Sequence, residues 1–188
     1  MTAPRIPDTG LPVEATVPAV RQALDRQRHA VLTAPPGSGK TTVVPLRLLD
    51  SDWLEGRKIV VLEPRRLATR AAARRMAHLL GEAVGGVVGY VTRTDRNTGP
   101  AVRVEVVTEG VLTRRLQRDP GLMDTGLVVF DEFHERNLQT DLGLALALDA
   151  RGVLRPDLRI LVMSATIDAA RVAALVGGDE PAPVVTAE

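Results

Sequence analysis

The stretch Ala-Pro-Pro-Gly-Ser-Gly-Lys-Thr-Thr at residues 34–42 constrains the fold of this chain more than any other feature. It follows an apolar run at 29–33 and precedes a second apolar run at 43–49, whose composition is compatible with a helix. A strand, a glycine-rich turn, Lys-Thr and a helix in this order are typical of a phosphate-binding loop. The stretch therefore predicts nucleotide binding at a strand–helix junction.

Each residue type in the loop has a physical reason to be there. Gly37 and Gly39 allow backbone conformations that a Cβ atom disfavours, so successive N–H groups can converge on phosphate oxygens. The helix that opens near Lys40 directs the positive end of its dipole at the same anion. Lys40 supplies a point charge for the β- and γ-phosphates, and Thr41 is placed to bind Mg²⁺. The candidate nucleotide-binding residues of the loop are Gly37, Ser38, Gly39, Lys40, Thr41 and Thr42.

The loop departs from the full phosphate-binding pattern at its first position, where Ala34 replaces Gly, so only Gly39-Lys40-Thr41 matches strictly. The alternative is a glycine-rich turn that binds nothing. The chain has two Lys against 22 Arg, so a general need for positive charge does not explain Lys40. This bias favours the nucleotide-binding interpretation.

Composition limits the classes of protein that remain. With 188 residues, of which 45% are hydrophobic, the chain is expected to form one domain with a sizeable core. Aromatic residues make up only 2%, so that core must consist of Val, Leu, Ile and Ala. The net charge of +1 predicts that any basic surface is local, and the absence of Cys excludes disulfides and thiolate metal sites. No run has the length of a signal peptide core or a transmembrane segment, so we expect a cytoplasmic protein without membrane contact.

Strand and helix patterns alternate along the chain, which predicts an α/β fold with a mostly parallel sheet and helices on both faces. Residues 1–16 are rich in Pro and turn formers and are expected to be irregular. The expected strands are 29–33, 58–62, 87–91, 102–107, 127–130, 159–163 and 184–185. The expected helices are 17–28, 43–49, 66–80, 109–117, 138–150 and 168–176, and 92–100 is expected to be a polar loop.

Polar clusters follow five of the expected strands, after Thr33, Leu62, Val107, Phe130 and Met163. In parallel sheets ligands bind beyond the carboxyl ends of the strands. The sequence therefore predicts that these clusters form one site.

Two adjacent carboxylates, Asp131 and Glu132, leave the strand 127–130 about ninety residues after Lys40. Beside a phosphate-binding loop, Asp131 would bind Mg²⁺, partly through water, and Glu132 would orient or deprotonate the attacking water. The alternative is a solvated acidic turn. His134 alone would be structural more often than functional, but beside this pair it could make a nucleotide-dependent contact with a neighbouring domain.

With these residues the chain resembles DEAH-box helicases of superfamily 2. Among them it resembles the bacterial HrpB type, whose box reads Asp-Glu-Phe-His, as residues 131–134 do in this chain. Such helicases commonly have Ala at the first loop position. Phe133 departs from the more usual Ala of the family and agrees with the HrpB type. The resemblance extends from about Arg21 to Glu188 and is carried by six ordered blocks, at 34–42, 63–69, 88–93, 108–113, 131–136 and 164–166.

The resemblance implies a RecA-like P-loop NTPase that uses ATP and Mg²⁺. Glu132, Lys40, Asp131 and His134 would be catalytic, and Arg75 matches a position whose guanidinium can stack on adenine. Ser164 and Thr166 look like the motif that links hydrolysis to strand movement. The residues that resemble nucleic-acid contacts are Arg65, Arg66, Arg93, Thr108, Glu109 and Gly110. Short polar groups and N–H donors at strand ends suit contact with the phosphate backbone without base reading.

The resemblance also implies an incomplete molecule, because such helicases bind ATP and single-stranded RNA between two RecA-like domains. Residues 17–188 match the first, ATP-binding domain, and the second is absent. We expect an isolated N-terminal lobe of an ATP-dependent RNA helicase, nearly inactive alone, because an arginine from a partner domain contributes about 10³–10⁵-fold to phosphoryl transfer. A nucleotide-binding regulatory module without turnover and a P-loop ATPase unrelated to nucleic acid remain alternatives. The choice between RNA and DNA also stays open.

Overall fold

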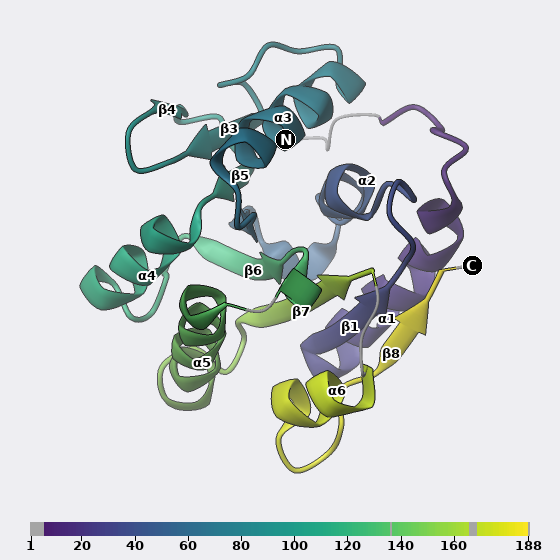
Figure 1. The fold of residues 1–188 in the computed structure, drawn as a ribbon, viewed down its shortest axis with the longest axis vertical. Helices are drawn as coiled ribbons and strands as arrows, with labels where there is room; N and C mark the ends of the chain where they lie inside the picture. The colour runs from purple at the N-terminus through teal and green to yellow at the C-terminus, as the bar shows by residue number, and fades with distance from the viewer. Residues whose placement is uncertain (1–5, 136, 166–168, 188) are drawn as a thin grey trace.

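The computed structural model describes residues 6–135, 137–165 and 169–187, which form a sheet covered by helices on both sides (Figure 1). The strands are β1 (His29–Thr33), β2 (Lys58–Leu62), β3 (Val88–Val91), β4 (Arg96–Asn97), β5 (Val104–Val107), β6 (Thr125–Phe130), β7 (Arg159–Ser164) and β8 (Val184–Thr186). The α-helices are α1 (Val17–Gln27), α2 (Lys40–Arg47), α3 (Arg66–Leu79), α4 (Glu109–Arg118), α5 (Leu138–Val153) and α6 (Ala169–Gly177). Short 3₁₀ helices are η1 (Pro12–Thr16), η2 (Asp52–Leu54) and η3 (Phe133–Glu135).

The described strands form one eight-stranded sheet in the order β4-β3-β5-β2-β6-β7-β1-β8. The pairing of β4 with β3 is antiparallel, and the other pairings are parallel. Parallel neighbours need crossover connections, which helices provide except between β3 and β5, where the chain passes through β4. The expected α/β class with a mostly parallel sheet is confirmed.

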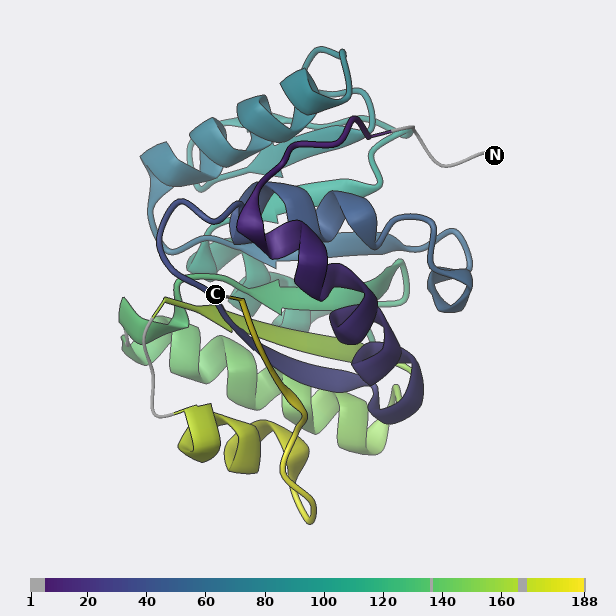
Figure 2. The same cartoon turned by 90° about the vertical axis from the view of Figure 1, so that its right-hand side faces the viewer.

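The core has two layers, one on each face of the sheet. Helices α1, α2 and α3 cover one face, and α4, α5 and α6 cover the other, as the two views show (Figures 1 and 2). Strand β6 shows the alternation, because Leu127 and Val129 pack on the first face while Val128 and Phe130 pack on the second. Burial on both faces explains why the central strands are continuous apolar runs.

A buried arginine fixes the connection between α4 and β6. Arg155, which is 5% exposed, follows α5 and donates hydrogen bonds to the carbonyl oxygens of Gly121 (2.7 Å), Leu122 (2.9 Å) and Thr125 (3.1 Å). Its Nε donates to Asp157 at 2.9 Å. One guanidinium thus satisfies several buried backbone acceptors that have no place in the sheet ladder.

Two expectations for the irregular segments are wrong in part. Residues 12–16 form η1, because proline fixes the φ angle that the first position of a helix requires. The expected polar loop 92–100 contains β4, because the Thr92 hydroxyl and the Asp95 backbone bond to one another and turn the chain back against β3. None of the described helices has the length and apolar character needed to cross a membrane.

Candidate active site

The polar clusters that follow the parallel strands lie along one edge of the sheet, as expected. The first residue after each strand, in the order of the strands across the sheet, is Thr92 (β3), Thr108 (β5), Glu63 (β2), Asp131 (β6), Ala165 (β7) and Ala34 (β1). The residues predicted to bind nucleotide follow β1 and β6, and those predicted to meet nucleic acid follow β3, β5 and β2. The residues predicted to bind nucleotide, called the nucleotide half, and those predicted to contact nucleic acid, called the nucleic-acid half, therefore meet between β2 and β6.

The predicted phosphate-binding loop connects β1 to α2. Gly37 and Gly39 have φ angles of +78° and +92°, the left-handed region that favours glycine. A Cβ atom at Gly39 would also lie 2.7 Å from Leu11 Cδ1. The loop is joined to β7 by a hydrogen bond from Ala34 N to Ser164 O (3.0 Å). Because the first N–H groups of a helix have no acceptor within it, the start of α2 offers donors to an anion.

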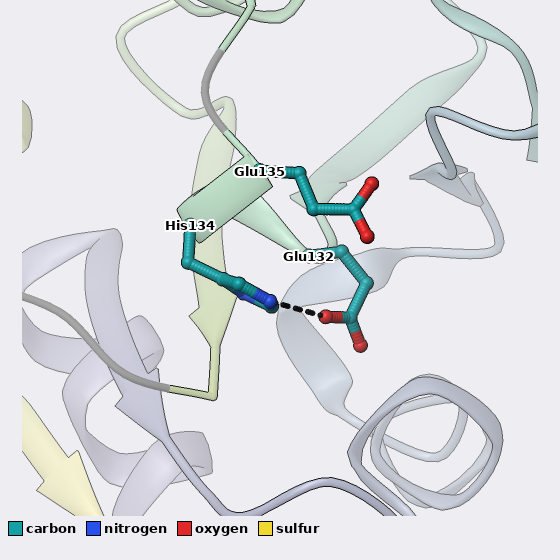
Figure 3. Close-up of side chains that lie close together, drawn as sticks. All are labelled: Glu132, His134 and Glu135. Carbon is teal, nitrogen blue, oxygen red and sulfur yellow. Dashed lines mark ion pairs between the residues drawn. The ribbon is translucent and has the colours of Figure 1, made fainter.

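Lys40 and Glu132 are paired across the site. Lys40 is 3% exposed, and its Nζ lies 3.1 Å from Glu132 Oε1. The other carboxylate oxygen of Glu132 lies 3.2 Å from His134 Nε2 (Figure 3). His134 Nδ1 accepts a hydrogen bond from Ala165 N at 3.4 Å, so a neutral ring would donate from Nε2 to Glu132. The cluster thus connects the phosphate-binding lysine to the end of β7.

Asp131 has the environment of a cation ligand. It is fully buried at the end of β6, and burial raises its pKa to about 6 even though a hydrogen bond with Thr41 favours the charged form. Its Oδ1 accepts a hydrogen bond from Glu132 N (2.9 Å), whereas Oδ2 has no partner among the described residues. An unpartnered buried carboxylate oxygen beside a threonine hydroxyl fits Mg²⁺ or a water bound to it.

The backbone of Glu132 is strained, with a φ angle of +49°. A non-glycine residue in this region costs about 1–2 kcal/mol. Such strain is characteristic of functional positions, where the surrounding structure holds a side chain in a required direction. At Glu132 the strain directs the carboxylate to Lys40.

The sequence interpretation missed two carboxylates that border the site, Glu63 and Glu135. Glu63 is 3% exposed, and burial, followed by the charge of Asp131, raises its pKa to about 7. Its Oε1 accepts a hydrogen bond from Arg65 N at 3.4 Å, and Arg65 Nη2 pairs with Glu135 Oε1 at 3.1 Å. The position of Glu63 directly after a buried strand, like that of Asp131, was the available signal.

Glu132, His134 and Glu135 offer donor atoms within 4.8 Å of one another, the spacing of a possible cation site (Figure 3). Glu132 and His134 bond to each other, and Glu135 is paired with Arg65. These partners account for the cluster without an ion.

The residues predicted to contact nucleic acid occupy the other half of the edge. Arg65 is the N-cap residue of α3 and Arg66 begins that helix, and both are exposed. Thr108 is the N-cap residue of α4, and Gly110 and Arg93 are exposed. This half therefore presents both charged side chains and a helix start to an approaching strand.

Other predicted residues have different surroundings. Glu109 accepts hydrogen bonds from Asn137 Nδ2 (2.6 Å) and Thr140 Oγ1 (2.7 Å), so its carboxylate joins α4 to α5. Arg75 is exposed on α3, which packs beside α2. Ser164 is buried at the end of β7, and Thr166 lies outside the described residues.

Comparison with known proteins identifies the family to which this chain belongs. The model of the DEAD/DEAH box helicase family matches residues 15–175. This chain belongs to that family. It is 52% identical over 180 residues to the ATP-dependent RNA helicase HrpB of Escherichia coli, which covers 96% of this chain and 22% of HrpB. It is 35% identical over 161 residues to the ATP-dependent RNA helicase HrpA of Borreliella burgdorferi, covering 86% of this chain and 19% of HrpA.

Solved structures agree with the family. The crystal structure of the Escherichia coli DExH-box NTPase HrpB matches with a TM-score of 0.90 at 50% identity, over 98% of this chain and 22% of that one. A crystal structure described as Escherichia coli DEAH/RHA helicase HrpB matches with a TM-score of 0.88 at 52% identity, over 95% of this chain and 22% of that one. The expected RecA-like helicase fold is confirmed, and this DEAD/DEAH box domain spans about one fifth of its relatives' length.

We expect Glu63→Gln to stabilise the nucleotide-free and metal-free domain at pH 8 by roughly 1–3 kcal/mol. Between the ordinary pKa of 4.5 and the folded value of about 7, the folded protein binds more protons at Glu63 than the unfolded chain does. The free energy of unfolding therefore falls as the pH rises from 4.5 to about 7. Above that pH the destabilisation caused by the buried Glu63 carboxylate is fully present. Urea denaturation at pH 5, 6, 7 and 8 measures the effect.

The control for this experiment is Glu180→Gln, which neutralises an exposed carboxylate after α6. Its denaturation midpoints should follow those of the parent domain at every pH. If Glu63→Gln shows the same pH dependence as the parent, Glu63 does not carry the stability change.

Proposed function

We propose that this chain is the N-terminal ATP-binding lobe of an ATP-dependent RNA helicase of the DEAH/HrpB type, acting in the cytoplasm. The observation that carries the proposal is the cluster of Lys40, Glu132 and His134, which joins the phosphate-binding loop, the box after β6 and the end of β7. A loop that only binds phosphate would not need a strained carboxylate held against its lysine.

In this proposal the residues from Gly37 to Thr42 bind the phosphates of ATP. Backbone donors at the start of α2 and the Lys40 ammonium meet the β- and γ-phosphates. Thr41 and Asp131 hold Mg²⁺, which when bound neutralises charge on the phosphate oxygens. Arg75 on the neighbouring helix α3 stacks on the adenine.

Glu132 changes partners when ATP binds. Without nucleotide its carboxylate pairs with Lys40 at 3.1 Å, and the phosphates compete for the same ammonium group. Once Lys40 turns to the phosphates, Glu132 is free to orient and deprotonate the attacking water. His134 remains bonded to the second oxygen and transmits the change to Ala165, which directly follows Ser164 at the end of β7.

The nucleic-acid half binds the backbone of single-stranded RNA, with DNA as the alternative substrate. The exposed side chains of Arg65, Arg66 and Arg93 meet phosphates, and the N–H groups at Thr108 and Gly110 meet phosphate or sugar oxygens. Glu109 contributes by fixing α4 against α5. A second RecA-like domain supplies the missing arginine and converts hydrolysis into strand separation.

The test is ATP hydrolysis by the full-length protein, with and without single-stranded RNA. We expect RNA to stimulate turnover, and Arg65→Gln to reduce this stimulation several-fold while the rate without RNA stays unchanged. The 188-residue chain alone should turn over about 10³–10⁵-fold more slowly than the full-length protein.

Three other results would each contradict the proposal. Hydrolysis that is indifferent to RNA and DNA would indicate a P-loop ATPase of another kind. Nucleotide binding without hydrolysis in the full-length protein would indicate a regulatory module. Rapid RNA-stimulated turnover by the chain alone would show that no second domain is needed.

A further inference from the structure

A basic cavity of about 430 Å³ lies between the β3–β4 turn and helix α4, and Arg93 is its one lining residue already assigned to nucleic acid. Val91 and Val111 form part of its wall. Its polar lining consists of Thr92 and five arginines, Arg93, Arg96, Arg114, Arg115 and Arg118. In a chain with a net charge of +1, so many arginines around one cavity form a strong local concentration of positive charge.

The carboxylates beside this cavity have other partners, and Asp119, which follows Arg118, accepts a hydrogen bond from Met123 N at 3.0 Å. Glu105, which is 2% exposed, pairs with Arg115 and accepts a hydrogen bond from Thr98 Oγ1 at 2.8 Å. Asp95 pairs with Arg70 at 3.0 Å and accepts a hydrogen bond from Tyr90 Oη at 2.7 Å. Neither Glu105 nor Asp95 is available to neutralise the remaining arginines of the cavity.

Four of the five arginines therefore keep an uncompensated charge. Within the described part of the chain, no ion pair joins Arg93, Arg96, Arg114 or Arg118 to a carboxylate. Arg114 donates a hydrogen bond from Nε to Gly110 O at 2.9 Å, and its two terminal nitrogens take no part in that bond. A cluster of unpaired guanidinium groups is a surface that recognises phosphate.

The framework beneath the cluster is held in place. Thr92 and Asp95 close the β3–β4 turn with hydrogen bonds of 2.9 and 3.1 Å, which sets the positions of Arg93 and Arg96. Arg114 and Arg118 are four residues apart on α4, so they lie on one face of that helix. The backbone segments that carry these arginines thus lie on two sides of the cavity and are held by hydrogen bonds, so little backbone entropy is lost when an anion binds.

We propose that this arginine cavity binds backbone phosphates of the same RNA strand, next to those met by Arg65, Arg66 and Thr108. The cavity adjoins the predicted path at Val91 and Arg93, at the carboxyl end of β3, and at Val111 in the first turn of α4, and it extends from there along α4 to Arg118. The inference rests on the proposed function, since it assigns further residues to the same strand. Arg96, Arg114 and Arg118 are the residues it adds.

The test measures binding of a 5′-fluorescein-labelled oligouridylate of twelve nucleotides to the full-length protein by fluorescence anisotropy, from 25 to 200 mM KCl. The variant carries Arg96→Gln and Arg118→Gln, both exposed positions. Loss of two phosphate contacts should reduce the slope of log affinity against log salt by about 1.4, at about 0.7 per contact for a single strand. At 0.1 M salt the affinity should fall about 10- to 30-fold.

The matched control carries Arg26→Gln and Arg28→Gln. Both arginines are exposed at the end of α1, which leads into the amino end of β1, and the control removes the same charge. Its affinity and salt slope should stay within twofold of the parent values. A third variant, Arg65→Gln with Arg66→Gln, reports on the interface of the proposed function.

The outcomes separate the two proposals. If the third variant weakens binding while Arg96→Gln with Arg118→Gln behaves as the control does, the cavity inference is overturned and the proposed function stands. If the full-length protein without substitutions does not bind the oligouridylate at 25 mM KCl, both are overturned. Both proposals are supported if the slope of log affinity against log salt falls in Arg96→Gln with Arg118→Gln and in the Arg65–Arg66 variant, and stays unchanged in the control.

Discussion

Replacing Glu132 with Gln is expected to lower the ATP turnover of the full-length protein by about 10²–10⁴-fold, the typical contribution of a general base. Gln keeps the size of the side chain and can still accept a hydrogen bond from His134, so the fold should not change. It cannot remove a proton from water. Steady-state phosphate release at saturating ATP and RNA measures the effect.

The same substitution should tighten ATP binding. Glu132 pairs with Lys40 at 3.1 Å, so its carboxylate competes with a phosphate for the Lys40 ammonium group. Removing the carboxylate charge removes the competitor, so we expect the dissociation constant of ATP to fall several-fold. Lower turnover with tighter binding separates this role from a general loss of structure.

Glu180→Gln is the control, because it removes an exposed carboxylate away from the phosphate-binding loop. It should leave turnover and ATP affinity within twofold of the parent values. Full turnover in the Glu132→Gln protein would show that another group activates the water.

The largest effect on stability is expected from Arg155→Ala, which should lower the free energy of unfolding of the domain by about 3–5 kcal/mol. The guanidinium satisfies the carbonyl oxygens of Gly121, Leu122 and Thr125, and all three of these bonds are buried. Alanine would remove the guanidinium donor from all three carbonyl oxygens, of which Leu122 O keeps its bond from Thr125 N, and would leave Asp157 without its strongest partner. Urea denaturation of the chain measures the change.

Arg26→Ala is the matched control for the loss of an arginine side chain, since Arg26 is exposed on α1. Its unfolding free energy should stay within about 0.5 kcal/mol of the parent value. A loss below 1 kcal/mol for Arg155→Ala would mean that water replaces the guanidinium at the three carbonyls.

The central strands could be predicted because both of their faces are buried. The runs at 58–62 and 127–130 consist almost wholly of apolar residues, and β2 and β6 occupy these positions. Strand β4 could not be predicted, because Arg96 and Asn97 are polar and pair only at the edge of the sheet. Its existence depends on a turn that the Thr92 hydroxyl closes, and hydrophobic periodicity does not report such a bond.

The residues that meet at the candidate site could be predicted where they belong to recognisable short motifs, and not where carboxylates outside those motifs meet charged groups from a neighbouring strand. Lys40, Asp131 and Glu132 belong to short motifs, and the structure brings them together. The effect of Asp131 on Glu63, and the pairing of Arg65 with Glu135, arise because β2 and β6 are neighbours. Strand order is a property of the whole sheet, so no local pattern could have predicted these contacts.

The strand order also determines where the two proposed ligand sites lie relative to each other. In the proposed function, nucleotide and nucleic acid bind to opposite halves of one edge of the sheet, and these halves meet where β2 lies beside β6. The Arg65–Glu135 ion pair crosses this boundary, and Glu135 belongs to η3, which directly follows Glu132. If the proposed function is correct, a substitution that breaks this ion pair is expected to weaken the coupling between the two ligands while each of them still binds.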